Sequence, residues 1–325
     1  MSHTPLLSLQ GVTRHFGGGR YPWGARRPLL HALQSVSLSM AQGETLGLVG
    51  ESGCGKSTLA RLVVGLDRPS CGRIEWRGED LADLVRRDRR ALARRLQYVF
   101  QDPLAALNPR RTVHQALETP LIHLRGLERD ARRQHLETLM ASVLLEPHHL
   151  QRYPHEFSGG QAQRIGIARA LAAEPELLVL DEPVSALDVS MQAQVLNLLA
   201  DLKQQLGLTY LFISHDLSVV ERVCDRVAVL YFGQLVELAP VSALFKRPRH
   251  PYSDLLLRSA PLPGKPSRVS ELQEGDLPDP YRPPAGCPFQ DRCPERQARC
   301  LREMPPLAPI GDAEGHSVAC HFPLG

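Results

Sequence analysis

The nine residues GESGCGKST, from Gly50 to Thr58, constrain the fold of this chain more than any other stretch. They fit G-x-x-x-x-G-K-[ST], the pattern of a phosphate-binding loop. The apolar run ETLGLV, which has the length of a strand, precedes them, and LARLVVGL, which has the composition of a buried helix, follows them. Strand, glycine-rich loop and helix are the context that this motif requires, so we predict an α/β fold with a P-loop NTPase core.

The residue types in the loop suit phosphate chemistry. Glycine allows backbone geometry that turns successive N–H groups toward phosphate oxygens, and the following helix N-terminus adds partial positive charge. Lys56 supplies a positive charge for the β- and γ-phosphates, and the Ser57 hydroxyl supplies a ligand for Mg²⁺. A glycine turn with a chance lysine is the alternative. The residues expected around the phosphates are Gly50, Glu51, Ser52, Gly53, Cys54, Gly55, Lys56, Ser57 and Thr58.

The length, composition and net charge of the chain exclude several classes of protein. With 325 residues, 43% hydrophobic and 22% charged, the chain is long enough to bury a large core. A net charge of +3 is too small to indicate nucleic-acid binding, and the arginine-rich run Arg86–Arg95 is interpreted as a solvated helix face. No apolar run approaches the ~18 residues of a membrane span, and MSHTPLLSLQ does not resemble a signal peptide. We expect a cytosolic chain whose seven cysteines are not presumed to form disulfides.

Two segments near the N-terminus alternate apolar and polar residues, as half-buried antiparallel strands do. They are Leu6–Val12 and Leu33–Met40, and Phe16–Pro28 between them is predicted to be a loop. Three aromatic residues of that loop could stack on a nucleotide base, although ordinary loop packing is favoured for any one of them. These aromatic residues are Phe16, Tyr21 and Trp23.

Polar residues follow three further strand-like runs, at the position where open α/β sheets bind ligands. Gln101 comes after LQYVF and could bind Mg²⁺ or the attacking water. Asp181 and Glu182 come after LLVL; Asp181 suits Mg²⁺, and Glu182 is placed to polarise a water as a general base. His215, after LTYLFIS, could reach a γ-phosphate. The alternatives are a strand that ends in exposed carboxylates and a structural histidine.

A helical pattern without strands covers Thr112–His149, which predicts a helical insertion in the α/β domain. FSGGQ follows at 157–161 and opens a long helix rich in Ala, Ile and Arg. Ser158 is a good N-cap, and Gly159 and Gly160 permit another backbone to approach closely. With Gln161 they form a second helix N-terminus that is suited to an anion.

Four cysteines gather in a tail that follows a proline-rich segment from Pro261. Five, six and nineteen residues separate Cys287, Cys293, Cys300 and Cys320 in turn. Cys287 and Cys293 each precede a proline, a pairing also found at iron–sulfur ligands. A bound metal could supply order that this tail's low apolar content does not. Zinc more often uses tighter Cys-x-x-Cys pairs, and free thiols remain the third possibility.

Taken together, these motifs resemble the ATPase subunit of an ABC transporter. GESGCGKST resembles the Walker A motif, LLVLDE Walker B and FSGGQ the ABC signature; Gln101 resembles the Q-loop, Ser185–Asp188 the D-loop and His215 the switch histidine. The resemblance covers residues 6 to about 240 and implies ATP and Mg²⁺ as ligands, with Ser57, Gln101 and Asp181 at the metal. It also implies a head-to-tail dimer, in which the signature reaches the partner's γ-phosphate. Phe16 would be the aromatic residue under the adenine.

VFQDPLAALNPR, RHPYSDLLL and the cysteine tail are similar to the second ATPase subunit of dipeptide/oligopeptide importers. This resemblance implies a second homologous ATPase subunit in a heterodimer, two membrane permeases and a periplasmic or extracellular peptide-binding protein. The chain would sit peripherally on the cytoplasmic face of the plasma membrane. A [4Fe–4S] cluster on the four tail cysteines is also implied. Nickel or glutathione import and a soluble non-transport ATPase are the rival functions.

The expected organisation has two parts. Residues 1–260 form the ATPase domain, with an antiparallel β subdomain and a helical subdomain at about 102–170. Residues 261–325 form the C-terminal transporter domain, with a Pro-rich linker and the small four-Cys appendage.

Overall fold

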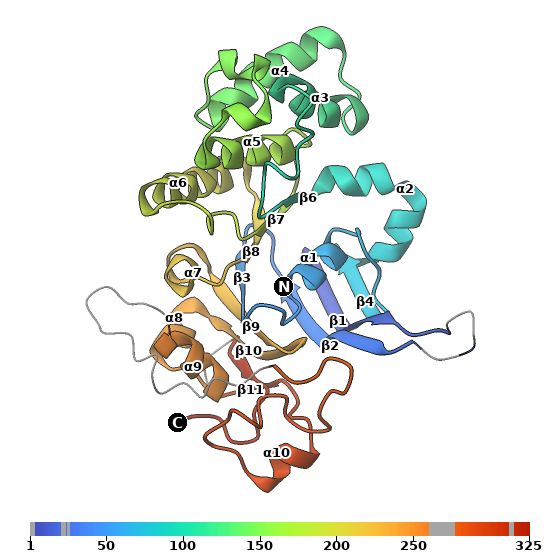
Figure 1. Cartoon of the computed structure of the whole chain (residues 1–325), viewed down its shortest axis with the longest axis vertical. Coiled ribbons are helices and arrows are strands. Elements are labelled where there is room, and N and C mark those ends of the chain that lie inside the picture. Colours follow the sequence, from blue (N-terminus) through green and yellow to red (C-terminus); the bar gives the residue numbers. More distant parts are fainter. Residues whose placement is uncertain (1–3, 21–23, 25–26, 260–276, 312–314) are drawn as a thin grey trace. The chain divides into compact units, whose positions relative to one another are not determined.

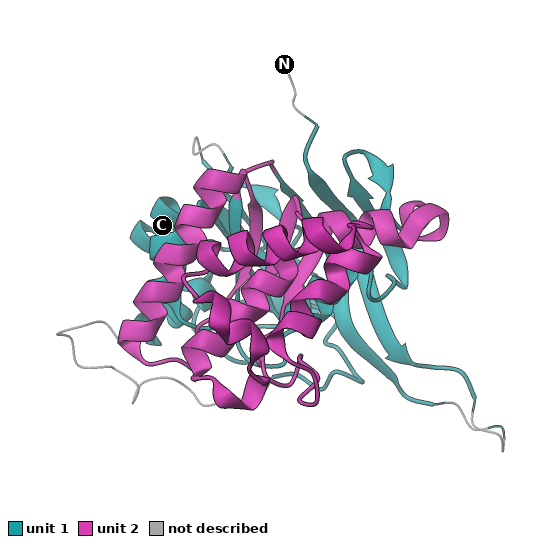
Figure 2. Ribbon diagram, turned by 90° about the horizontal axis from the view of Figure 1, so that it is seen from above, with its two compact units in different colours: residues 1–40, 45–81, 214–325 teal, residues 41–44, 82–213 magenta. Residues whose placement is uncertain are grey.

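A computed structural model of the chain describes residues 4–20, 24, 27–259, 277–311 and 315–325. The described chain divides into two compact units, which Figure 2 shows in different colours. Figure 1 labels the helices and strands. Unit 1 contains residues 1–40, 45–81 and 214–325, and unit 2 contains residues 41–44 and 82–213. The phosphate loop belongs to unit 1 and the FSGGQ segment to unit 2. Tyr21, Trp23 and the proline-rich segment from Pro261 to residue 276 lie outside the described residues.

Unit 1 contains two sheets and short helices. Its elements are β1 (Leu7–Gly17), β2 (Leu29–Met40), β3 (Thr45–Val49), α1 (Lys56–Val63), β4 (Cys71–Trp76), β5 (Glu79–Asp80), α7 (Leu217–Val223), β9 (Arg226–Tyr231), β10 (Gln234–Pro240), α8 (Val241–Lys246), α9 (Pro251–Ser259), α10 (Ala298–Arg302), β11 (Ala308–Pro309) and β12 (Ser317–Val318). One sheet has the order β2-β1-β4-β5 and is antiparallel. The predicted antiparallel β subdomain is therefore present.

The first hairpin is longer than the sequence pattern predicted. β1 continues to Gly17, with Phe16 opposite Leu30 in β2, so the predicted loop from Phe16 to Pro28 began two residues too early. Its predicted end at Pro28 agrees with the structure, where β2 starts at Leu29, four residues before the strand predicted from Leu33. Alternation of apolar residues marks only the half-buried part of a strand. Backbone pairing extends beyond it because ladder hydrogen bonds do not depend on side-chain type.

The second sheet carries the phosphate loop. Within unit 1 its strand order is β11-β12-β10-β9-β3, and β3 runs parallel to β9. All five residues of β3 are buried, as expected of a strand covered on both faces. β9 and β10 form a hairpin, and Phe232 and Gly233 between them have φ values of 48° and 74°. Two successive left-handed residues are the signature of a tight type I′ turn.

The C-terminal tail adds β12 to this sheet, next to β10. Glu237 of β10 is fully buried, and its carboxylate accepts hydrogen bonds from the N–H groups of Arg249 and His250, both at 2.8 Å. His316, which is also buried, approaches the same carboxylate at 2.7 Å. A buried carboxylate is stable only with such partners. Sheet pairing and this network therefore order a tail for which the sequence had indicated only a bound metal.

Unit 2 combines a parallel sheet with helices. Its elements are α2 (Leu81–Arg95), β6 (Leu96–Val99), α3 (Val113–His123), α4 (Arg129–Ser142), the 3₁₀ turns η1 (Pro147–Gln151) and η2 (Pro154–Glu156), α5 (Gly159–Leu171), β7 (Leu177–Asp181), α6 (Val189–Leu206) and β8 (Thr209–Ile213). The strands have the order β8-β7-β6, with parallel pairing throughout. The segment predicted to be helical, Thr112–His149, forms α3, α4 and the start of η1.

The arginine-rich run lies on α2, most of it exposed, as predicted. The helix is interrupted at Asp88 (φ −155°), whose carboxylate accepts hydrogen bonds from the N–H groups of Arg90 and Ala91 at 3.0 Å each. Asp88 thus caps the second half of the helix. Within the described ranges, no helix has both the length and the apolar content to cross a bilayer.

Candidate active site

The phosphate loop follows the carboxyl end of β3 in unit 1. Gly50, Gly53 and Gly55 have φ values of 149°, 80° and 107°, a region that favours glycine. A Cβ at Gly50 would lie 2.1 Å from the carbonyl oxygen of Leu230, and one at Gly55 would lie 2.6 Å from that of Ala32. Both contacts are too short for any side chain, so this backbone path requires glycine. The predicted strand–loop–helix context is confirmed, with α1 starting at Lys56.

Lys56 is buried, and its ammonium group is held by the loop itself. Nζ donates hydrogen bonds to the carbonyl oxygens of Gly50 at 2.7 Å and Glu51 at 2.9 Å. The positive charge therefore sits inside the curve of the loop. Ser57, one residue further on, is exposed and therefore accessible to a ligand. Cys54 is buried, so its side chain lines the interior, and burial raises the pKa of its thiol. Its N–H donates a hydrogen bond to the Glu51 carbonyl at 3.3 Å.

Two residues that sequence reasoning did not select hold Glu51 of the phosphate loop. The N–H of Glu51 donates a hydrogen bond to the Tyr252 hydroxyl at 2.9 Å. The carboxylate accepts two hydrogen bonds from the Arg292 guanidinium, each at 2.8 Å. Tyr252 lies in RHPYSDLLL, which we used only as a subfamily signature, and Arg292 directly precedes Cys293. No local pattern could have linked either residue to position 51.

In unit 2, the end of β7 brings three of the predicted residues together. Asp181 is buried and accepts a hydrogen bond from the hydroxyl of Tyr98 on β6. The carboxylate of the next residue, Glu182, accepts a hydrogen bond from Gln101 Nε2 at 2.9 Å. Parallel strands end at the same edge of a sheet, so β6 and β7 deliver Gln101 and Glu182 side by side. The end of the sheet therefore presents an amide and a half-buried carboxylate side by side.

Glu182 also has an unusual backbone, with φ at 47°. This left-handed conformation costs energy in a residue other than glycine and persists only where its surroundings enforce it. Here the Glu182 N–H donates to the Ile213 carbonyl at 3.0 Å, and the Ser185 hydroxyl donates to the Glu182 carbonyl at 3.1 Å. The turn that resembles the D-loop therefore fixes the direction of the Glu182 side chain.

Ser158 caps α5, as the sequence predicted. Its hydroxyl accepts a hydrogen bond from the Gln161 N–H, while the Ser158 N–H donates to Gln161 Oε1 at 3.2 Å. Ser158 and Gly159 are exposed, whereas a Cβ at Gly160 would meet the end of the Met191 side chain at 1.9 Å. The start of this helix therefore leaves N–H groups open to an anion.

Phe16 and His215 both belong to unit 1. Phe16 is 39% exposed, and the guanidinium carbon of Arg14 lies 4.5 Å from the centre of its ring. His215 is exposed and follows Ser214 at the start of the turn into α7, where the Asp216 carboxylate caps the helix. Both side chains are accessible to a ligand.

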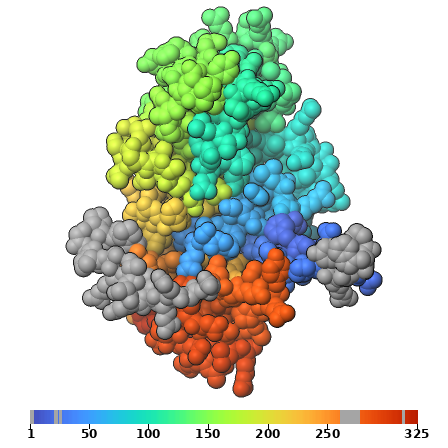
Figure 3. Space-filling model, viewed as in Figure 1, coloured from blue at the N-terminus to red at the C-terminus, as the bar shows by residue number. Residues whose placement is uncertain are grey.

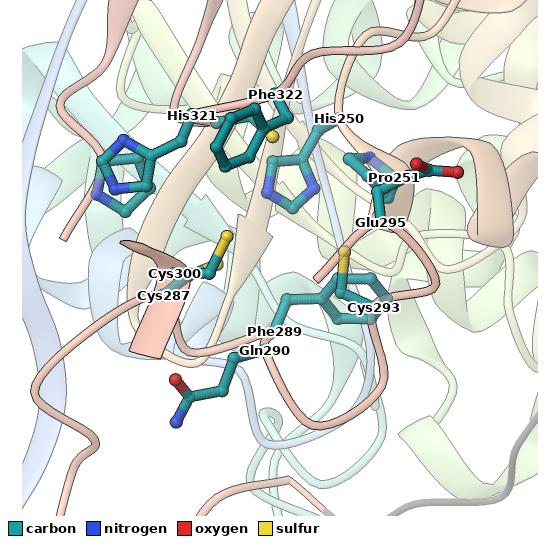
Figure 4. Close-up of a pocket in the computed structure, with 12 residues that line it drawn as sticks. His250, Pro251, Cys287, Phe289, Gln290, Cys293, Glu295, Cys300, His321 and Phe322 are labelled. Atoms are coloured by element: carbon teal, nitrogen blue, oxygen red, sulfur yellow. The ribbon is translucent and has the colours of Figure 1, made fainter. Parts of the chain in front are cut away.

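The four tail cysteines line one cavity in unit 1, together with His250, Phe289 and Phe322 (Figure 4). Cys287 and Cys300 are neighbours, because the Cys287 N–H donates to the Cys300 carbonyl at 2.8 Å (Figure 4). Burial, with a smaller contribution from the neighbouring thiols, raises the pKa of Cys287 to about 12 and that of Cys293 to about 11. In the part of the chain that the structure describes, no group of three or more His, Cys, Asp or Glu side chains is spaced as the ligands of a metal ion.

Comparisons with known proteins agree with these motifs. The family "ABC transporter" matches residues 33–185, and "Oligopeptide/dipeptide transporter, C-terminal region" matches residues 236–300. A probable peptide ABC transporter ATP-binding protein of Sinorhizobium fredii is 48% identical over 97% of this chain and 89% of its own length. The oligopeptide transport ATP-binding protein AppF of Bacillus subtilis is 47% identical over 98% of this chain and 97% of its own.

Solved structures show the same fold. CbiO1 of Clostridium perfringens, part of an ABC transporter complex, superposes with a TM-score of 0.64 at 28% identity, over 75% of this chain and 91% of that one. A dimeric ATP-binding cassette in a post-hydrolysis state, bound to ADP and Pi, superposes with a TM-score of 0.63 at 29% identity, over 72% of this chain and 98% of that one.

Proposed function

This chain belongs to the ABC transporter family of ATP-binding proteins, and on that premise we propose that it is an ATP-hydrolysing subunit that powers the import of di- and oligopeptides. One observation supports the peptide assignment above all others. Relatives described as peptide or oligopeptide transport ATP-binding proteins match nearly the full length of the chain, and the family model of the transporter C-terminal region matches residues 236–300. The phosphate loop supports the ATP assignment, because its glycine backbone and enclosed lysine suit a triphosphate.

The nucleotide-binding residues are assigned by role. The loop from Gly50 to Thr58 holds the phosphates through N–H groups other than that of Glu51, which donates to Tyr252. Lys56 faces the β- and γ-phosphates, and Phe16 stacks on the adenine. Ser57, Gln101 and Asp181 would hold Mg²⁺, which would neutralise the charge that develops on the phosphates. The donor set fits a hard cation, since it offers a hydroxyl, an amide oxygen and a carboxylate.

In the proposed hydrolytic step, Glu182 accepts a proton from the attacking water. Gln101, whose amide donates to the Glu182 carboxylate, orients that carboxylate and the water. His215 donates a hydrogen bond to the γ-phosphate. The left-handed turn at Glu182 keeps the carboxylate in place before the nucleotide arrives, so little reorganisation is needed at the moment of reaction.

The proposed assembly contains more than this chain. Ser158, Gly159, Gly160 and Gln161 complete the ATP site of a second, homologous ATPase subunit, and the reverse also holds. Closure of this heterodimer on ATP and its reopening after hydrolysis drive two membrane permeases, which receive peptide from a periplasmic or extracellular binding protein. The chain is then a peripheral subunit on the cytoplasmic face of the plasma membrane. Residues 1–260 act as the ATPase domain and 261–325 as the C-terminal transporter domain.

Transport by the reconstituted complex tests this function. The permeases, the second ATPase and the binding protein are sought among the products of the neighbouring genes. They are then purified and placed in liposomes with the full chain. We expect ATP-dependent uptake of a labelled dipeptide, and peptide-loaded binding protein should stimulate ATP hydrolysis. Uptake of Ni²⁺ or glutathione without peptide uptake would overturn the peptide assignment. An absence of ATP hydrolysis by the wild-type complex would overturn the ATPase assignment.

We further propose that the four tail cysteines hold a [4Fe–4S] cluster. Four thiols line one cavity, and such clusters take four cysteine ligands. The thiols are not spaced as metal ligands in this structure, so cluster binding would have to draw them together. Burial opposes ionisation of Cys287 and Cys293, so a nearby cation would be needed to stabilise their thiolates. When bound, the cluster would cross-link the tail. Its role is structural, since ATP hydrolysis has no redox step.

Metal analysis of anaerobically purified protein is expected to find about four irons and four sulfides per chain, with a brown colour. Cys293→Ser should lose most of this iron, whereas Cys71→Ser, at an exposed cysteine outside the tail, should keep it. The measurements are iron and sulfide assays and a visible spectrum. One zinc per chain would favour the zinc alternative. Colourless, iron-free protein that is folded and active would exclude the cluster.

A further inference from the structure

Glu51 is the second residue of the phosphate loop, and its N–H, its carbonyl and its carboxylate all form hydrogen bonds. Its N–H donates to Tyr252, its carbonyl accepts from Lys56, and its carboxylate binds Arg292. Tyr252 and Arg292 both come from the C-terminal part of unit 1. In the space-filling view, orange residues of that part border the blue residues around the phosphate loop (Figure 3).

Arg292 is itself fixed by its surroundings. Its side chain is only 13% exposed, and its guanidinium carbon lies 5.9 Å from the ring centre of Tyr231 and 5.8 Å from that of Phe289. Phe289 is buried and packs edge-to-face on Tyr231, with ring centres 5.3 Å apart. The Arg292 N–H also donates to the Phe289 carbonyl at 3.1 Å. A guanidinium with this support presents its two donors in one geometry.

The segment that carries Arg292 spans two of the cavity-lining cysteines. It runs from Cys287 to Cys293, and Phe289 lines the same cavity (Figure 4). The Gln290 N–H donates to the Cys287 carbonyl at 3.1 Å, so the segment is a compact turn. Any change that moves Cys287 or Cys293 must therefore move Arg292, which adjoins Cys293 in the chain.

We propose that Arg292 is a positioning residue for the phosphate loop, and that through it the cysteine-lined cavity controls the affinity of this chain for nucleotide. The inference rests on the proposed ATP site and names a control of that site. Two physical effects support it. The bidentate pair holds the Glu51 backbone, and with it the N–H groups that bind phosphate, in one orientation. It also neutralises a carboxylate that would otherwise repel the phosphates.

Nucleotide binding to the full-length chain tests the proposal. The dissociation constant of a fluorescent ATP analogue is measured with Mg²⁺. Arg292→Ala is expected to weaken binding about tenfold, which corresponds to about 1.4 kcal/mol. Arg292→Lys keeps the positive charge but loses the two-donor guanidinium, so its dissociation constant should fall between those of Arg292→Ala and wild type. Arg296→Ala, a loss of an exposed arginine in the same tail that pairs with Asp291, should have no effect.

Two further measurements separate positioning from general destabilisation. Glu51→Gln combined with Arg292→Ala should bind nucleotide more tightly than Arg292→Ala alone, because the repelling carboxylate is gone. Hydrogen exchange of the peptide around residues 50–55 should speed up in Arg292→Ala, while that of β7, in unit 2, stays unchanged. Circular dichroism is the control that checks whether each variant is folded.

The link to the cysteines is tested by non-additivity. Cys293→Ser should weaken nucleotide binding, but it should add little in the Arg292→Ala background if its effect passes through Arg292. Equal effects in both backgrounds would overturn the link, and unchanged binding in Arg292→Ala would overturn the positioning role. Failure of the wild-type chain to bind nucleotide would instead overturn the proposed function.

Discussion

Glu182→Gln is expected to lower the rate of ATP hydrolysis by about 10²–10⁴-fold, the usual cost of removing a general base. The substitution preserves the volume of the side chain and leaves an amide oxygen that can still accept from Gln101. The amide cannot take a proton from water, so ATP should still bind, and dimers closed on ATP should accumulate. The measurements are kcat in the assembled complex, nucleotide affinity and the fraction of dimer with ATP.

Glu176→Gln is the matched control, because Glu176 immediately precedes the opposite end of the same strand and pairs with Arg95 on the surface. It should hydrolyse ATP at the wild-type rate. Wild-type turnover by Glu182→Gln would remove Glu182 from the role of base. A loss of ATP binding in that variant would indicate damage to the site and not to the chemical step.

Ser158→Arg is expected to reduce hydrolysis at the partner's ATP site by about 10²–10³-fold, as loss of a preorganised donor at a reacting group does. A long arginine side chain at the exposed start of α5 would obstruct the approach of a γ-phosphate to the helix N–H groups. The chain's own phosphate loop is unchanged, so it should still bind ATP. The measurement is the rate of ATP hydrolysis by a heterodimer of this chain, carrying Ser158→Arg, and its partner subunit. In this heterodimer only the partner's ATP site can hydrolyse ATP.

Thr112→Arg controls for the loss of a helix cap, since Thr112 and Gln115 form the same capping box at the start of α3. Both variants should lose about 1 kcal/mol of stability, but only Ser158→Arg should lose turnover. Full-rate hydrolysis by the monomeric wild-type chain would contradict the composite site, because no partner would then be needed.

Local patterns were sufficient for many of the elements. Ser158 was predicted as a cap because a serine before a helix accepts from N–H groups within its own turn. The strand LLVL at 177–180 was visible because a strand that is buried on both faces gives a continuous apolar run over a few residues. Phe16 was misplaced for the opposite reason: its pairing with Leu30 is a property of two backbones, and its own side chain gives no signal of it.

By itself, then, the sequence determined the phosphate loop, the polar ends of the strands and the cap of α5, because their physics acts between near neighbours. Only the tertiary structure decided how the tail is attached. Arg292 meets Glu51 across 241 positions, Tyr252 meets it across 201, and His316 meets Glu237 across 79. The local sequence around a charged residue does not indicate its distant partner. Burial strengthens these pairs, and it exists only once the chain has folded.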